Sequence, residues 1–122
     1  MVKPHKKLNV WQLAMDIVEY VYNLTETFPA HERFGLTSQL RRCAVSVPSN
    51  IAEGAARNTT KEFINFLHIA QGSLSELDTQ LEISFRLKLI NQEYLLSLDS
   101  KLLQVDQMLS GLISSLKKTP NS

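Results

Sequence analysis

The chain has 122 residues and is 43% hydrophobic, which is enough for one domain with a real core but too little to indicate two. Its formal net charge of +1 does not fit a nucleic-acid-binding protein that is basic overall, and its single cysteine excludes an internal disulfide. Only four glycines and four prolines interrupt the chain, which favours helices over a sheet with its many turns. We therefore expect a single all-α domain over residues 1–122.

The sequence shows no membrane or export signal. No run of about 18 uncharged apolar residues could span a bilayer. The N-terminal stretch MVKPHKKLNVWQLA is basic, but the apolar core of a signal peptide does not follow it. We expect a cytoplasmic protein with no membrane partner.

The first predicted helix covers about residues 8–28. Its polar residues recur at alternating steps of three and four, which makes one narrow solvated stripe: Asn9, Gln12, Asp16, Glu19, Asn23 and Glu26. Nearly all its other residues are apolar. A helix that is apolar over most of its circumference needs cover on more than one side, so this helix indicates an interface with another subunit.

The second predicted helix covers about residues 37–57, with Thr37 or Ser38 as its N-terminal cap. Its apolar register continues through Pro48, which favours one kinked helix over a break with Pro48 as the first residue of a new helix. Cys43 lies among Ala44, Val45 and Val47, and we interpret it as a small buried hydrophobe.

The third and fourth predicted helices cover about residues 60–89 and 92–118. Thr59 or Thr60 is placed to cap the third, and the chain turns into the fourth around Asn91. Gly72 lies inside the third helix, where glycine costs about 1 kcal/mol relative to alanine, so we expect a close backbone contact there. Four helices with short connections predict a left-handed up-down-up-down bundle.

This topology gathers basic residues at one end of the bundle. The start of helix one, the junction of helices two and three, and the end of helix four meet there, and they carry Lys3, Lys6, Lys7, Arg57, Lys61, Lys117 and Lys118. These side chains are either solubilising charge or a surface for RNA or DNA phosphates. In a ring of subunits the basic end would repeat around an axis, which favours binding through multivalency.

A second candidate site is a set of polar residues on helices two and three. Its members are Arg41, Arg42, Ser46, Asn50 and Glu53 on helix two, and Ser73 and Glu76, followed by Gln80, on helix three. If the two faces meet, Arg42 can pair with Glu76, and Asn50 or Glu53 can bond across the helices. The set is a network that fixes helix register, or a pocket or partner surface; paired-carboxylate chemistry is the least favoured alternative.

No motif for catalysis, metal or cofactor binding is present. His5, His31 and His68 lie in different predicted elements, and none stands in an HEXXH frame. Phosphate-binding glycine loops, nucleophile elbows and paired cysteines are also absent. We expect a protein that is not an enzyme and that uses no metal and no cofactor.

The stretches FGLTSQLRRCAVSVPSNIAEGAAR and TTKEFINFLHIAQGSLSELDTQLEIS closely resemble the four-helix bundle proteins of the 23S rRNA intervening-sequence family. The similarity rests on positions 34–36, 38–42, 46, 48, 50–54, 57, 63, 70 and 72–77. The predicted lengths of helices one and four also agree with that family. The combination is more specific than any single short motif.

The resemblance implies a small bundle that assembles into a homopentameric ring and is encoded in some bacteria within sequences that interrupt ribosomal RNA genes. Similar proteins accompany the reverse transcriptases of retroelements, where a basic pentamer contacts nucleic acid and the enzyme; the present chain departs from that type in being nearly neutral. We expect a non-enzymatic, oligomeric accessory protein that binds RNA or DNA through the basic ring. The alternative is a protein-interaction scaffold that uses the polar face of helix two.

Overall fold

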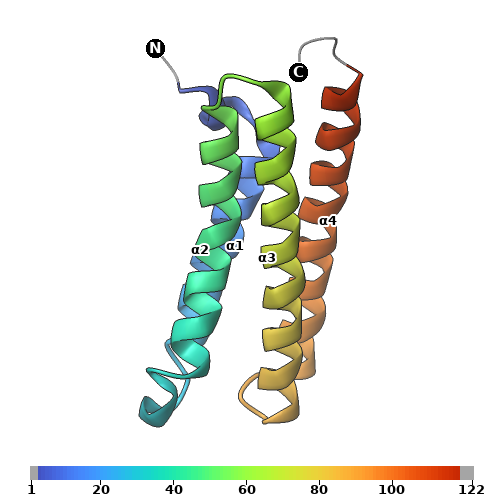
Figure 1. Cartoon of the computed structure of the whole chain (residues 1–122). Coiled ribbons are helices and arrows are strands. Elements are labelled where there is room, and N and C mark those ends of the chain that lie inside the picture. The colour runs from blue at the N-terminus through green and yellow to red at the C-terminus, as the bar shows by residue number, and fades with distance from the viewer. Residues whose placement is uncertain (1–2, 119–122) are drawn as a thin grey trace.

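The chain is described over residues 3–118 by a computed structural model. Four α-helices run through it: α1 (Asn9–Thr25), α2 (Leu36–Ala55), α3 (Thr60–Arg86) and α4 (Gln92–Lys117). Two short 3-10 helices, η1 (Pro4–Lys7) and η2 (Ala30–Glu32), precede α1 and α2. The helices alternate in direction, and no strand occurs among the described residues (Figure 1). The predicted all-α four-helix architecture is confirmed.

The helices form a ring in chain order around one core. Each helix packs against its sequence neighbours, α4 closes the ring onto α1, and no Cα atoms of diagonal helices come within 8 Å of each other in residues 3–118. Fully buried side chains line the interior from all four helices, among them Ile17, Leu40, Leu77 and Leu98. None of the described helices combines the length and the apolar character needed to cross a membrane.

The contact between α2 and α3 is the most extensive in the bundle, and Gly54 explains how close it is. A Cβ at position 54 would lie 2.8 Å from the Cβ of Phe66 and 2.9 Å from Cδ1 of Phe63. The close approach predicted at Gly72 is wrong, because a Cβ there would meet no atom within 4 Å. The glycine that the packing requires is therefore on the second helix and not on the third.

Pro48 lies inside α2, and the helix continues through it. The continuous-helix alternative thus holds over a new helix beginning at the proline. Pro48 is itself buried with Val47 and Ile51, so the apolar register that runs through this segment keeps it facing the core.

Side chains cap the helices at three of the four N-termini. Thr59 Oγ1 accepts from the Glu62 amide at 3.1 Å, and Asn91 Oδ1 accepts from the Tyr94 amide at 2.8 Å. The prediction for α2 is wrong: Thr37 and Ser38 lie within its first turn, and Glu32 Oε1 accepts from the Leu36 amide at 3.1 Å. The acceptor comes from the preceding η2, which sequence spacing around Thr37 could not reveal.

Two helices end about three residues earlier than predicted. α1 ends at Thr25 instead of about residue 28, and α3 ends at Arg86 instead of about residue 89. After α3, Lys88 adopts a left-handed backbone with φ of 64°, and the amides of Lys88 and Leu89 donate to the carbonyls of Phe85 and Ser84. This pattern is a Schellman ending formed without glycine. It turns the chain into α4.

Candidate functional site

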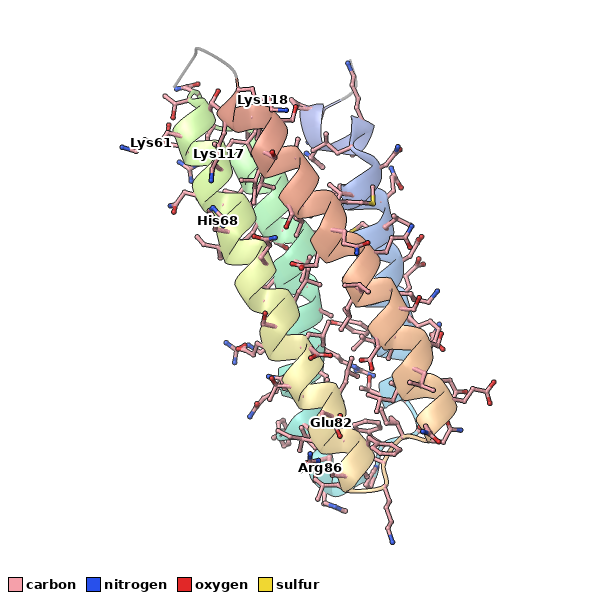
Figure 2. All side chains as sticks on the ribbon, turned by 90° about the vertical axis from the view of Figure 1, so that its right-hand side faces the viewer. Lys61, His68, Glu82, Arg86, Lys117 and Lys118 are labelled. Carbon is pink, nitrogen blue, oxygen red and sulfur yellow. The ribbon has the colours of Figure 1, made fainter. Side chains whose placement is uncertain are left out.

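The seven cations predicted to share one end of the bundle do lie at that end, which we call the basic end. Lys61, Lys117 and Lys118 are together there, whereas Glu82 and Arg86 mark the opposite end (Figure 2). The chain start with Lys3, Lys6 and Lys7 and the α2–α3 connection with Arg57 reach the same end (Figure 1). All seven side chains are exposed.

Among the described residues only one cation of the basic end has an ion-pair partner. Arg57 Nη2 lies 2.7 Å from Glu53 Oε1, and its guanidinium also sits 4.8 Å from the centre of the Phe66 ring. No carboxylate lies within 4 Å of the six lysines in the part of the chain that the structure describes. Exposed lysines without a fixed partner keep flexible charges available to an outside anion.

The second candidate site is a groove between α2 and α3. It has a volume of about 420 Å³ and is lined by Gln39, Arg42, Cys43, Ser46, Ser73, Glu76 and Gln80. Ser46 Oγ and Ser73 Oγ lie 2.7 Å apart, and Cys43 Sγ donates to the Ser73 carbonyl oxygen at 3.0 Å. These polar contacts link α2 to α3, which run antiparallel to each other.

The cross-helix contacts predicted for Arg42, Asn50 and Glu53 do not form among the described residues. Arg42 and Glu76 both line the groove, but no ion pair links them. Asn50 Nδ2 donates to Ser46 O at 2.8 Å and to Ser46 Oγ at 3.0 Å, within α2. Glu53 pairs with Arg57 on the same helix. The hydrogen bond across the two helices is made by Ser46 and Ser73, whose short side chains let the helices approach each other.

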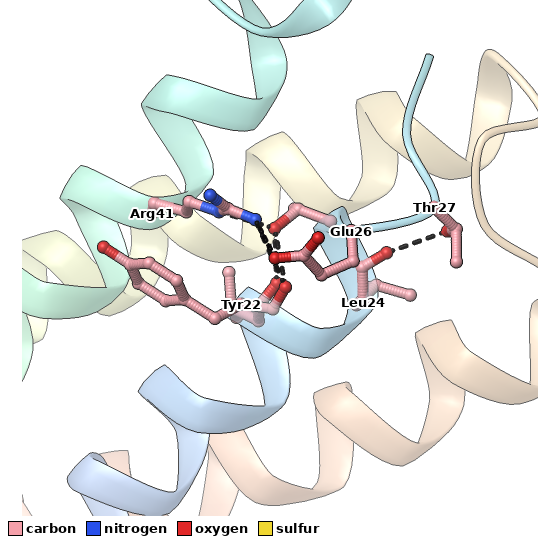
Figure 3. A network of polar contacts seen from close by, with 7 residues as sticks. Tyr22, Leu24, Glu26, Thr27 and Arg41 are labelled. Atoms are coloured by element: carbon pink, nitrogen blue, oxygen red, sulfur yellow. Dashed lines mark hydrogen bonds and ion pairs between the residues drawn. The ribbon is translucent and has the colours of Figure 1, made fainter. Parts of the chain in front are cut away.

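Arg41 does not belong to the groove. It faces α1, where its Nε donates to Thr25 Oγ1 at 2.8 Å and its Nη2 lies 3.4 Å from Glu26 Oε1 (Figure 3). Its guanidinium also stacks 4.5 Å from the centre of the Tyr22 ring. Adjacent residues on a helix point about 100° apart, so Arg41 and Arg42 serve different helix pairs.

Cys43 is buried as predicted, with 5% of its surface exposed. Burial, followed by the nearby Glu76 carboxylate, raises the pKa of the thiol to about 12. The thiol therefore stays protonated at neutral pH, where it is a hydrogen-bond donor and a poor nucleophile. Cys43 and Gln39 were missing from the predicted site. Gln39 lies three residues before Arg42, and Cys43 lies three residues before Ser46; this spacing is the signal that places them on the same face.

No group of three or more His, Cys, Asp or Glu side chains within residues 3–118 could hold a metal ion. A second, acidic depression between α3 and α4 is lined by Asp78, Asp99 and Asp106 with apolar neighbours. The pKa of Asp99 is raised, first by burial and then by the Asp78 carboxylate, with a smaller effect from Glu82. The Asp78 and Asp99 carboxylates repel each other across the helix pair.

Comparison with known proteins gives a family and a fold. The family model described as 23S rRNA-intervening sequence protein matches residues 6–111. A crystal structure from Bacteroides thetaiotaomicron, of a protein with unknown function from the S23 ribosomal protein family, is similar with a TM-score of 0.80 and 24% sequence identity. The similarity covers 86% of this chain and 95% of that one. No curated protein matches the chain.

Proposed function

The chain belongs to the 23S rRNA-intervening sequence protein family, and on this premise we propose that it is a non-enzymatic accessory protein of the cytoplasm that binds RNA or DNA phosphates. It assembles into a cyclic homopentamer, and the basic ends of the subunits form the binding ring. The observation that carries the proposal is the set of exposed lysines at one end of the bundle without carboxylate partners. A nearly neutral protein has a local cationic surface there.

The binding mechanism is phosphate contact without reading of bases. Lysine ammonium groups on flexible stems act as point charges and carry no bidentate hydrogen-bond pattern for a base edge. Each phosphate contact releases counterions, so affinity depends steeply on salt. Repetition of the basic end around a ring multiplies weak contacts into useful affinity.

Exposed apolar side chains support the oligomer. Phe34 is 90% exposed, and the large apolar residues Tyr22 and Val45 line the same depression at the α1–α2 face. Burial of such residues against another copy removes apolar surface from water. Native mass spectrometry is expected to give five times the mass of the 13.8 kDa chain. A strict monomer at micromolar concentration would contradict the ring.

The test of phosphate binding is a fluorescence-anisotropy titration of the assembly against labelled structured RNA and single-stranded DNA at low salt. Micromolar or tighter binding is expected. The double variant Lys117→Glu, Lys118→Glu should weaken it about 100-fold or more, because several phosphate contacts are lost in every subunit. The matched variant Arg86→Glu, Lys88→Glu makes the same charge change at the opposite end and should retain most of the affinity.

A protein-interaction scaffold is the second candidate function, with the partner on the polar face of α2. The supporting observation is that Arg42 is exposed at the groove and has no ion-pair partner in the described chain. Arg42→Gln and Asn50→Ala would weaken capture of such a partner while nucleic-acid binding is unchanged, because neither residue lies at the basic end. If the Lys117→Glu, Lys118→Glu variant alone loses its partner, the scaffold candidate is rejected.

A further inference from the structure

The groove between α2 and α3 changes character along its length. At one level the Ser46 and Ser73 hydroxyls bond each other at 2.7 Å, and the Cys43 thiol donates to the Ser73 carbonyl oxygen at 3.0 Å. About two helical turns further toward the opposite end, Gln39 and Gln80 face each other with only a long contact of 3.5 Å between Nε2 of Gln80 and Oε1 of Gln39. Short hydrogen bonds therefore join the two helices at Ser46 and Ser73, whereas the helices are only weakly joined at Gln39 and Gln80.

Gln80 is poorly satisfied for a buried residue. It is 8% exposed, lines the groove, and its Oε1 has no hydrogen-bond partner among the described residues. A buried carbonyl without a hydrogen-bond partner destabilises the fold, whereas one that is hydrogen-bonded costs little. The Gln80 side chain lines the groove, so its unsatisfied amide carbonyl is the atom that a hydrogen-bond donor on a bound ligand would satisfy.

Two charged side chains of opposite sign stand beside this amide. Arg42 on α2 and Glu76 on α3 line the same groove, are both exposed, and form no ion pair with each other. Cys43 Sγ lies 3.7 Å from Glu76 Oε1, but its single proton already donates to the Ser73 carbonyl oxygen at 3.0 Å, so the Glu76 carboxylate keeps its capacity to accept hydrogen bonds from a ligand. The groove therefore offers an anionic and a cationic contact with a polar amide near both.

We propose that this groove binds a small zwitterion of amino-acid size, whose ammonium or guanidinium group donates to Glu76 and to Gln80 Oε1 and whose carboxylate pairs with Arg42. The volume of about 420 Å³ lies in the range of about 300–1,000 Å³ typical of small-molecule sites. A ligand with both charges satisfies all three side chains, whereas a simple cation leaves Arg42 unpaired and a simple anion meets Glu76. The site is separate from the basic end, so it stands or falls independently of nucleic-acid binding.

Isothermal titration calorimetry on the full-length assembly tests the proposal. The probes are the twenty standard amino acids and γ-aminobutyrate, with agmatine as a cation without carboxylate and succinate as an anion without ammonium. At least one zwitterion is expected to bind saturably in the millimolar range or below, and about tenfold or more tighter than agmatine and succinate. The side-chain amide of Gln80 should shift in ¹H–¹⁵N spectra at the same ligand concentrations.

Variants separate a ligand site from a structural network. Gln80→Leu should abolish binding and leave the melting temperature unchanged or raised, because it removes an unbonded buried carbonyl. Arg42→Gln should weaken binding about tenfold or more, while Arg86→Gln, an exposed arginine outside the groove, should not.

Three results would overturn the proposal: no saturable zwitterion binding, equal binding of agmatine or succinate, or unchanged affinity in Gln80→Leu. A marked fall in melting temperature for Gln80→Leu without ligand would assign the residue to the fold instead. RNA affinity is expected to be the same in Gln80→Leu and the parent chain, and a loss there would show that the groove and the basic end are not independent.

Discussion

The two ends of the bundle use their basic residues differently. At the opposite end, Arg41 pairs with Glu26 and stacks on Tyr22, and Arg86 lies 3.3 Å from Glu82. At the basic end, Arg57 alone has a carboxylate partner within residues 3–118, and the lysines have none. The formal net charge of +1 sums over the whole chain and does not show this difference between the two ends. Arg41 and Arg86 pair with carboxylates, whereas the lysines of the basic end remain available to a partner.

The two ends of the bundle also differ in packing, because Gly54 allows α2 and α3 to approach closely near the basic end. Gly54→Ala is expected to destabilise the fold by about 1–3 kcal/mol, since the new methyl would lie 2.8 Å from Phe66 Cβ. Gly72→Ala on the same helix pair is the control, and should stabilise the chain by about 1 kcal/mol or less because position 72 is open. Chemical denaturation measures the free energy of unfolding of both variants. Equal effects would show that the close α2–α3 packing does not require Gly54.

Arg41 and Lys118 test the difference between the two ends directly. Arg41→Ala should destabilise the fold by about 1–2 kcal/mol, because its guanidinium bonds Thr25 Oγ1 at 2.8 Å and stacks on Tyr22. Lys118→Ala should change the free energy of unfolding by less than about 0.5 kcal/mol. Urea titration of both variants gives the comparison. A larger cost at Lys118 than at Arg41 would reverse the assignment of roles.

The turn at the opposite end has a residue that the backbone does not favour. Lys88 has φ of 64°, so Lys88→Gly is expected to stabilise the chain by up to about 1 kcal/mol. Thermal unfolding should show a rise of a few degrees. An unchanged or lower melting temperature would mean that the Lys88 side chain makes a contribution that outweighs the backbone strain.

The smallest expected effect concerns Asp99, which shares a depression with Asp78. Its pKa is raised above the ordinary value of 3.8, so the folded chain binds this proton more tightly than the unfolded chain. The stabilisation is present at low pH and is lost as pH rises from about 4 through the folded pKa. Asp99→Asn should therefore stabilise the chain by about 0.5 kcal/mol or less at pH 7, and by less at pH 3. A larger gain at pH 3 would contradict the sign.

The sequence was informative where one helix determines its own structure. Apolar spacing through Pro48 favoured a continuous α2, and the Thr59 cap and the gathering of Lys61 with Lys117 followed from local pattern and chain order. It was less informative where two elements meet. The carboxylate that caps α2 comes from Glu32, Arg41 turns to α1, and Gly54 rather than Gly72 faces a neighbour.

The groove shows the same limit. Helical spacing selected Arg42, Ser46, Ser73 and Glu76, which do line it. Which of these residues bond to each other depends on the axial offset and the separation of α2 and α3. The 2.7 Å contact between the Ser46 and Ser73 hydroxyls reflects both quantities, and the pattern of a single helix predicts neither. The weak contact between Gln39 and Gln80 could be found only from the relative position of the two helices.

The most direct test of the account is the salt dependence of RNA binding. For the parent assembly, the logarithm of affinity should fall linearly with the logarithm of salt concentration, with a slope that reports several phosphate contacts. Lys117→Gln with Lys118→Gln should make that slope markedly shallower, and Arg86→Gln with Lys88→Gln should leave it unchanged. Equal slopes for the three proteins, or no binding at low salt, would contradict a phosphate-binding surface at the basic end.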